Sequence, residues 1–194
     1  MKPPQNPYDV DGFHAEAIAA GRHRDVVGGR WEETGRVQMA LLRDAGLLPH
    51  HHLLDIGAGS LRLGCKAVSY LEPGHYWATD ASRALMLAGH AAELNEPARL
   101  NPDHLIEDAR FDYPAVPGCI THAIAFTVFL APNATEATTA YRQPDGVVTH
   151  DIRPPYHILS EDVDHIARIT GWQALRSPLR LPRGQVLYTA QPLR

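Results

Sequence analysis

The sequence predicts an α/β fold with a mainly parallel sheet, and three observations lead to this prediction. Strand-like apolar stretches alternate with helix-like stretches between residues 49 and 107, a pattern typical of parallel sheets. The first of these strands runs directly into a loop that holds Gly57 and Gly59. An aspartate also lies at the end of each of the three expected strands. With 194 residues, the chain suits one compact domain.

Two helices are expected before the sheet. Residues 1–12, rich in Pro, Asn and Asp, form either an ordered arm or a frayed tail. Residues 13–28 mix apolar residues with His and Arg and predict a helix that ends at Gly28 and Gly29. The next helix ends at Gly46. Its apolar members are Trp31, Val37, Met39, Leu41 and Leu42.

The first half of the sheet follows in regular order. Strands are expected at 52–56, 75–79 and 104–107, and helices at 61–71 and 83–94. Pro73-Gly74 marks a turn before the second strand, which Asp80 closes. Ser82 is placed to cap the helix that begins at Arg83.

The second half is less regular. Residues 120–130 are apolar and β-branched and predict one long buried strand. A short helix over 133–142 and a strand over 146–152 are expected next. Ser160 should cap an amphipathic helix that ends before Gly171, with Val163, Ile166, Ala167 and Ile169 on one face. Residues 172–177 and 185–190 predict an antiparallel pair at the sheet edge.

Composition excludes several classes of protein. A net charge of −4 disfavours a general nucleic-acid binder, which needs clustered cations. No apolar run approaches the roughly 20 residues of a membrane span, and the N-terminus lacks a signal pattern. Cys65 and Cys119 are too few for a disulfide framework, so we expect a cytoplasmic protein with two reduced thiols.

Residues 50–52 are consecutive histidines that point in different directions on a strand, so no metal site is expected.

The segment LLDIGAGSLRLG, residues 53–64, carries the chemistry. It is not the dinucleotide fingerprint, because the third glycine, Gly64, comes too late, and no Gly-Lys-Ser/Thr of a phosphate-binding loop follows. Asp55, just before the glycines, would repel a pyrophosphate but suits a cationic ligand. Ligands of such folds bind beyond the carboxyl ends of the strands.

An acidic residue followed by Gly-x-Gly resembles the first motif of the class I S-adenosylmethionine (SAM) methyltransferases. The resemblance implies a Rossmann-like fold, SAM as cofactor and S-adenosylhomocysteine as product. It also implies that Asp55 supports the loop and the amino group of SAM, through water. The other cofactor-binding residues follow from the same motifs. Gly57, Ala58, Gly59 and Ser60 would pack against the methionine part and ribose, Asp80 with Ala81 would bind the ribose hydroxyls, and Asp108 with Ala109 would receive the adenine.

The upstream segment 21–42 resembles a small bacterial subfamily of these enzymes, in which N-terminal helices cover the pocket. Candidate lid residues are Arg22, His23, Arg24, Trp31 and Glu32, and the alternative is a solvated helix face with one core Trp. The expected organisation is one domain over 1–194, with a helical cap over 1–48 and a Rossmann-like core over 49–194.

The chain departs from the family pattern by being shortened after the third strand. Either 120–130 is the fourth strand and its helix is very short, or residues 125–132 are the fifth strand and the fourth is missing; the sequence favours the second interpretation. Missing cover should leave apolar sheet surface bare and favour a homodimer, although the N-terminal helices could cover the gap instead. The residues concerned are Ile120, Ile124, Phe126, Val128 and Phe129.

The function expected from these features is SAM-dependent methyl transfer to a small-molecule acceptor. Methyl transfer is an in-line displacement in which the protein supplies position and charge. His150 or His157, in the loop that also holds Tyr156, would act as base or substrate contact. Two alternatives remain: a catalytically silent SAM-fold binding or scaffold protein, and an enzyme that uses SAM for another reaction.

Overall fold

A computed structural model describes residues 12–27, 29–110, 112–113, 115–125, 160–169, 171–180 and 186–193. The chain separates into two compact units. The larger unit spans residues 7–129, and the smaller unit combines residues 1–6 with 130–194. None of the described helices has the length and apolar character needed to cross a bilayer.

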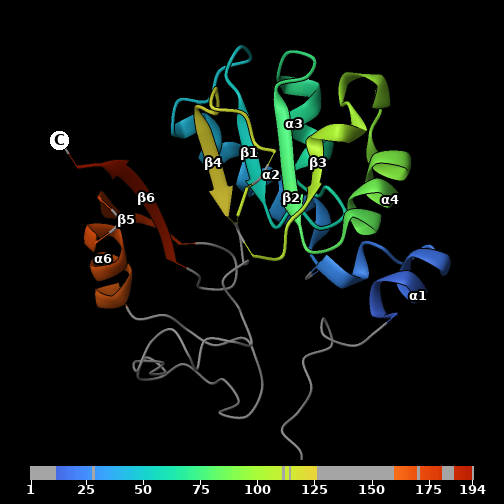
Figure 1. Cartoon of the computed structure of the whole chain (residues 1–194), viewed down its shortest axis with the longest axis horizontal. Helices are drawn as coiled ribbons and strands as arrows, with labels where there is room; N and C mark the ends of the chain where they lie inside the picture. Colours follow the sequence, from blue (N-terminus) through green and yellow to red (C-terminus); the bar gives the residue numbers. More distant parts are fainter. Residues whose placement is uncertain are drawn as a thin grey trace, which may run out of the picture. The chain divides into compact units, whose positions relative to one another are not determined.

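The larger unit is built on a four-stranded parallel sheet (Figure 1). Its strands are β1 (Leu53–Ile56), β2 (Tyr76–Asp80), β3 (Leu105–Glu107) and β4 (His122–Ala125), in the spatial order β3-β2-β1-β4. All three strands expected in the first half of the chain are therefore confirmed to within one residue at either end. The α/β class with a parallel sheet is confirmed, and the topology is compatible with a Rossmann-like fold.

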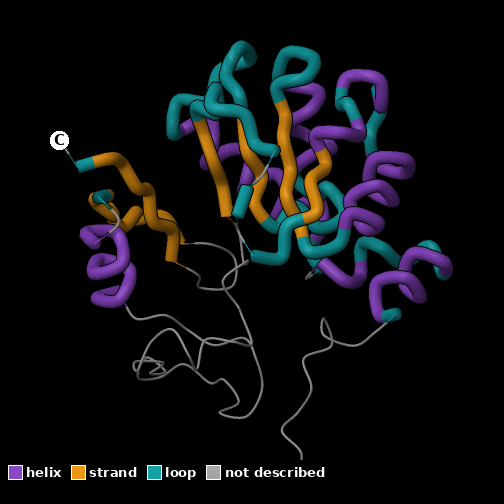
Figure 2. The backbone as a smooth tube through the Cα atoms, in the orientation of Figure 1, coloured by secondary structure: helices purple, strands orange, loops and turns teal. Residues whose placement is uncertain are grey.

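Helices α3 (Gly64–Tyr70) and α4 (Arg83–Glu93) cover one face of this sheet (Figure 2). The buried strand residues on that face pack with helix residues in one apolar core. The core includes Leu53, Tyr76, Ala78 and Leu105 from the strands and Ala67, Val68 and Met86 from the helices. Two short 3₁₀ turns, η3 (Pro97–Arg99) and η4 (Pro102–His104), lead into β3.

The N-terminal part differs from the single helix expected over residues 13–28. Helix α1 (Phe13–Ala19) is short, and a 3₁₀ turn, η2 (Asp25–Val27), follows. Gly21 has a φ of 66°, a left-handed conformation that an α-helix cannot contain. The expectation of one continuous helix is therefore wrong, because the chain turns back at Gly21.

Helix α2 (Trp31–Asp44) is confirmed, and Gly46 ends it with a φ of 91°. Of the apolar residues named for this helix, Leu42 is buried. The buried residues are Thr34, Gly35, Gln38 and Leu42, whereas Trp31, Val37, Met39 and Leu41 are half-buried. Gly35 explains the choice of face: a Cβ there would lie 2.9 Å from the Arg62 carbonyl oxygen, so the helix packs closely through its smallest residue.

The next two helices follow the sequence more closely. Helix α3 begins at Gly64 rather than at residue 61, because Leu61 has a φ of 63°. The cap of α4 is confirmed: the Leu85 amide donates to Ser82 Oγ at 3.3 Å.

Strand β4 settles the choice between the two interpretations of residues 120–130. It pairs directly with β1, with Leu53 level with His122 and Asp55 level with Ile124. The interpretation in which the fourth strand is missing is therefore wrong. Ile124 packs against the apolar core, so it does not form part of a bare surface as predicted. Residues 126–159, with the expected short helix and the 146–152 strand, lie outside the described residues.

The smaller unit contains α6 (Ser160–Ile169) and the antiparallel pair β5 (Trp172–Arg180) and β6 (Val186–Pro192). The helix and the hairpin are confirmed. The hairpin forms a two-stranded sheet of its own, and its place at the edge of the larger sheet stays a prediction. Ala167 is buried, but Ile169 is 69% exposed, because it lies off the helix face shared by Val163 and Ala167.

Candidate functional site

The glycine loop between β1 and α3 is bound to β2 by its backbone amides. The amides of Gly57 and Ala58 donate to the Thr79 carbonyl at 2.7 and 3.1 Å. The Gly59 amide donates to Asp80 Oδ2 at 2.9 Å. Since all three amides are directed at the protein, they do not form the outward nest of N–H groups that binds phosphate.

Asp80 lies where the sequence places it, at the end of β2 and beside the loop. Its second oxygen, Oδ1, accepts from the Ser82 amide at 3.0 Å. Each carboxylate oxygen therefore accepts one backbone N–H, and each has a further acceptor site. The side chain is half-buried, and the neighbouring Ala81 is exposed. A ligand with adjacent hydroxyl groups would find an acceptor here.

Asp55 faces the interior rather than the outer side of the loop. It is 3% exposed and accepts a hydrogen bond from the Tyr76 hydroxyl at 2.6 Å. Burial raises the pKa of Asp55 to about 7. The Tyr76 hydrogen bond and the Arg62 charge oppose this shift, and the Asp80 charge adds to it. A role toward the amino group of a ligand stays a prediction.

Asp108 closes the turn that follows β3. Its carboxylate accepts from the Arg110 and Tyr113 amides, both at 2.9 Å, and from the Asp112 amide at 3.3 Å. Such bonds are typical of an aspartate that forms a turn. Ala109 is exposed beside it. The contact of Asp108 with an adenine stays a prediction.

The loop is also held by two close approaches to glycines. A Cβ at Gly89, on α4, would lie 2.1 Å from the Ser60 carbonyl oxygen. A Cβ at Gly59 would lie 2.6 Å from Val27 Cγ1. Helix α4 and the N-terminal segment therefore both touch the loop backbone directly, and neither contact leaves room for a side chain.

No protein-family model matches the chain, and no solved structure matches it.

The lid residues expected from the sequence are engaged with α3 and α4. His23 Nε2 and Arg24 Nε both lie 2.7 Å from Glu93 Oε1. The Arg24 guanidinium also lies 4.9 Å from the centre of the Trp31 ring, a cation–π distance. Glu32 pairs with Lys66 of α3 at 2.8 Å. Arg22 is exposed.

Sequence reasoning missed three residues of this region. Arg62 is 8% exposed, and its Nη1 donates to the carbonyls of Val27 and Gly29 at 2.8 and 3.0 Å. Arg62 could have been singled out as the cation within an apolar stretch. Tyr76 and Glu93 give no such signal, because their partners depend on strand register and on how α4 packs.

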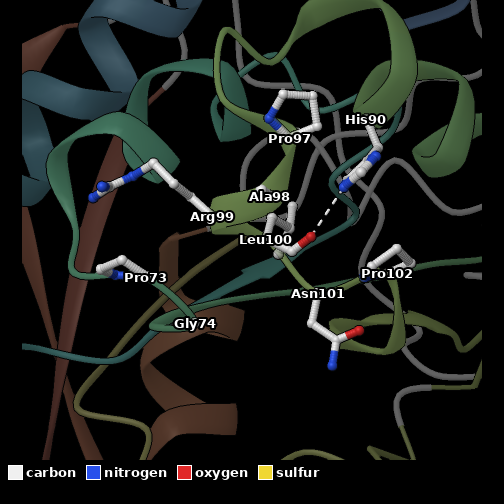
Figure 3. Close-up of a pocket in the computed structure, with 9 residues that line it drawn as sticks. All are labelled: Pro73, Gly74, His90, Pro97, Ala98, Arg99, Leu100, Asn101 and Pro102. Carbon is white, nitrogen blue, oxygen red and sulfur yellow. Dashed lines mark hydrogen bonds between the residues drawn. The ribbon is translucent and has the colours of Figure 1, made fainter.

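A hollow of about 590 Å³ lies at the opposite, amino edge of the sheet (Figure 3). Its polar groups bind the protein itself. His90 Nε2 lies 2.9 Å from the Leu100 carbonyl, and Arg99 Nη2 donates to the Leu71 carbonyl at 2.6 Å. This hollow therefore offers little chemistry for a ligand.

Two further expectations concern metals and catalysis. Within the described ranges, no three His, Cys, Asp or Glu side chains are grouped so as to hold a metal ion. His50 and His51 precede β1 in a turn, and their rings contact each other at 4.4 Å, so the argument from strand geometry does not apply to them. His150 and His157 lie outside the described residues.

Proposed function

We propose that the chain binds SAM at the glycine loop and transfers its methyl group to a small-molecule acceptor through an O, N or C nucleophile. One observation carries this proposal: the amides of Gly57, Ala58 and Gly59 bind β2, while the Asp80 carboxylate stands beside the loop. Such a loop suits a ligand with hydroxyls and positive charge better than one with phosphates.

Each loop residue has a stated task in this proposal. When bound, SAM supplies an electrophilic methyl group on a sulfonium. Asp80 would accept the two ribose hydroxyls, and Gly57 to Ser60 would pack against the ribose and methionine parts. Asp55, whose pKa lies at about 7 because it is buried, would gain charge beside a cationic ligand. His150 or His157 would remove a proton from the acceptor or contact it.

A second candidate is a catalytically silent SAM-fold binding or scaffold protein. The contact of Val27 with Gly59 favours it, because this contact occupies the surface that a cofactor would use. The two candidates differ in turnover: only the enzyme would convert methyl-labelled SAM into S-adenosylhomocysteine and a labelled small molecule.

Calorimetry with SAM and S-adenosylhomocysteine tests the binding step. Asp80→Ala should weaken binding by about 1–3 kcal/mol, the scale of removing the partner of a buried polar group. Asp103→Ala, an exposed aspartate on η4, is the matched control and should bind as the wild type does. Thermal melts must accompany both variants, because Asp80 also accepts the Gly59 amide. Equal affinity of the wild type and a folded Asp80→Ala variant would exclude the ribose assignment.

A further inference from the structure

The segment made of residues 22–27 and 29–30, here called the strap, is attached to the glycine loop by three hydrogen bonds. Ser60 Oγ donates to the His23 carbonyl at 3.0 Å. Arg62 donates to the carbonyls of Val27 and Gly29. These bonds run from loop side chains to strap backbone, so they hold the strap at the loop whatever its side chains are.

The Val27 side chain then lies directly on Gly59. A Cβ built on Gly59 would lie 2.6 Å from Val27 Cγ1 and 3.4 Å from Val27 Cβ. The Val27 side chain and the Gly59 backbone therefore leave no space for a ligand atom between them. A segment that merely covered a pocket would leave a gap of at least one ligand layer here.

The outer side of the strap is held by one carboxylate and a small apolar cluster. Glu93 is paired with His23 and Arg24, and its side chain is 6% exposed. The hydrogen bond from Arg24, with a second from His23, holds the pKa of Glu93 below its ordinary value. Val26 packs with Ala17 and Leu85. A short segment with so few buried side chains opens more readily than the sheet does.

We propose that the strap is a displaceable plug, in which Val27 occupies the Gly59 surface until a ligand takes its place. The proposal rests on the proposed function, since it concerns SAM at the same loop. If the strap must open before SAM binds, the apparent dissociation constant is the intrinsic one divided by the open fraction. Changes that weaken the strap should therefore tighten SAM binding, although they remove contacts.

Two variants and one control test this on the full chain. Val27→Ala removes the contact with Gly59, and Glu93→Gln removes the charge that holds His23 and Arg24. Both should lower the apparent dissociation constant for SAM by about 3- to 10-fold, which corresponds to a strap that is mostly closed in the free protein. Val37→Ala removes the same two methyl groups from a half-buried valine on α2 and should leave affinity unchanged.

Trypsin cleavage after Arg22, Arg24 and Arg30 provides an independent measurement. SAM should speed cleavage at these sites, because displacement frees the strap. A lid that closes over the ligand, as expected from the sequence, would slow it. Hydrogen exchange of residues 17–27, with α2 as internal reference, should rise with SAM in the same way.

The outcomes separate the two proposals. Slower cleavage in the presence of bound SAM would overturn the plug and leave the proposed function intact. Unchanged or weaker SAM affinity in Val27→Ala and Glu93→Gln would have the same meaning. Absence of SAM binding in the wild type and in both weakened variants would overturn the proposed function and the plug together.

Discussion

The two edges of the parallel sheet are built by different means. At the carboxyl edge, directional hydrogen bonds fix the glycine loop, from Gly59 to Asp80 and from Arg62 to the strap. At the amino edge, rings stack across neighbouring strands. His52 lies on His75 with centroids 3.9 Å apart, Trp77 on His104 at 3.5 Å, and His51 on His122 at 4.8 Å.

The stacked rings of the amino edge leave some of their own buried nitrogens without a hydrogen-bond partner. Among the described residues, the buried nitrogens His52 Nδ1, His75 Nδ1 and Trp77 Nε1 have no hydrogen-bond partner. The Asp55 and Asp80 carboxylates all have partners. Hydrogen bonds fix distance and direction, whereas stacked rings tolerate sliding. The hydrogen bonds of the glycine loop therefore give it the fixed geometry that a binding site needs.

The largest expected effect comes from the buried carboxyl at the loop edge. The pKa of Asp55 is about 7 in the folded chain, against an ordinary value of 3.8. Stability from this group is fully present below pH 3.8 and is lost as the pH rises through about 7, by up to about 4 kcal/mol. Asp55→Asn should remove this fall. Urea denaturation between pH 4.5 and about 7.5 measures it.

Asp103→Asn, at an exposed position, is the control for that series and should follow the wild type. If the stability of the wild type and of Asp55→Asn changed with pH in the same way, burial would not raise the pKa of Asp55.

The second-largest effect should come from the close approach of α4 to the backbone of the glycine loop. Gly89→Ala would place a methyl group 2.1 Å from the Ser60 carbonyl oxygen, so α4 has to move away. We expect a loss of about 1–3 kcal/mol in unfolding free energy, the range for overpacking a filled site. Denaturant melts measure it. Gly118→Ala, with no atom within 4 Å of the new Cβ, should change stability by less than about 0.5 kcal/mol; similar losses for both would contradict the packing argument.

The smallest expected effect comes from the amino edge. There, stability should fall as the pH drops, which is the opposite of the effect of Asp55. Burial, with the neighbouring His75 and His104, lowers the pKa of His52 from 6.5, and Glu72 opposes the shift. The unfolded chain then binds the proton more readily, so stability should fall as the pH drops below 6.5. His52→Phe keeps a ring on His75 and should lose that slope. Thermal melts across pH 5–7 measure this slope. They compare Asp55→Asn with the double variant Asp55→Asn/His52→Phe, so that the titration of Asp55 does not contribute. An unchanged slope would exclude His52.

The sequence could predict the elements better than the contacts between them. The strands of residues 53–56 and 76–80 were recognisable because apolar runs end at acidic residues and glycines. The Ser82 cap was recognisable because it depends on residues only three apart. The contacts that hold the loop join residues far apart in sequence. Tyr76 reaches Asp55 because the two share a sheet face, which only the register of β1 and β2 decides.

The same reason explains which roles the sequence could not supply. Position alone placed Asp108 after the third strand, and only the structure shows that its carboxylate closes a local turn. Val27 and Glu93 were not candidates, because a valine and a surface-type glutamate carry no chemical signal until the strap and α4 are packed together.

The pairing of His23 and Arg24 with Glu93 has a consequence for the order of folding. These partners are 70 and 69 residues apart in sequence. A loop of that length closes slowly unless the chain between its ends is already ordered. The strap is synthesised before the sheet but cannot dock until β1, β2 and α4 exist. We therefore expect the strap to be among the last segments to fold, although it is synthesised before the sheet. Its docking should be visible as late protection of residues 22–27.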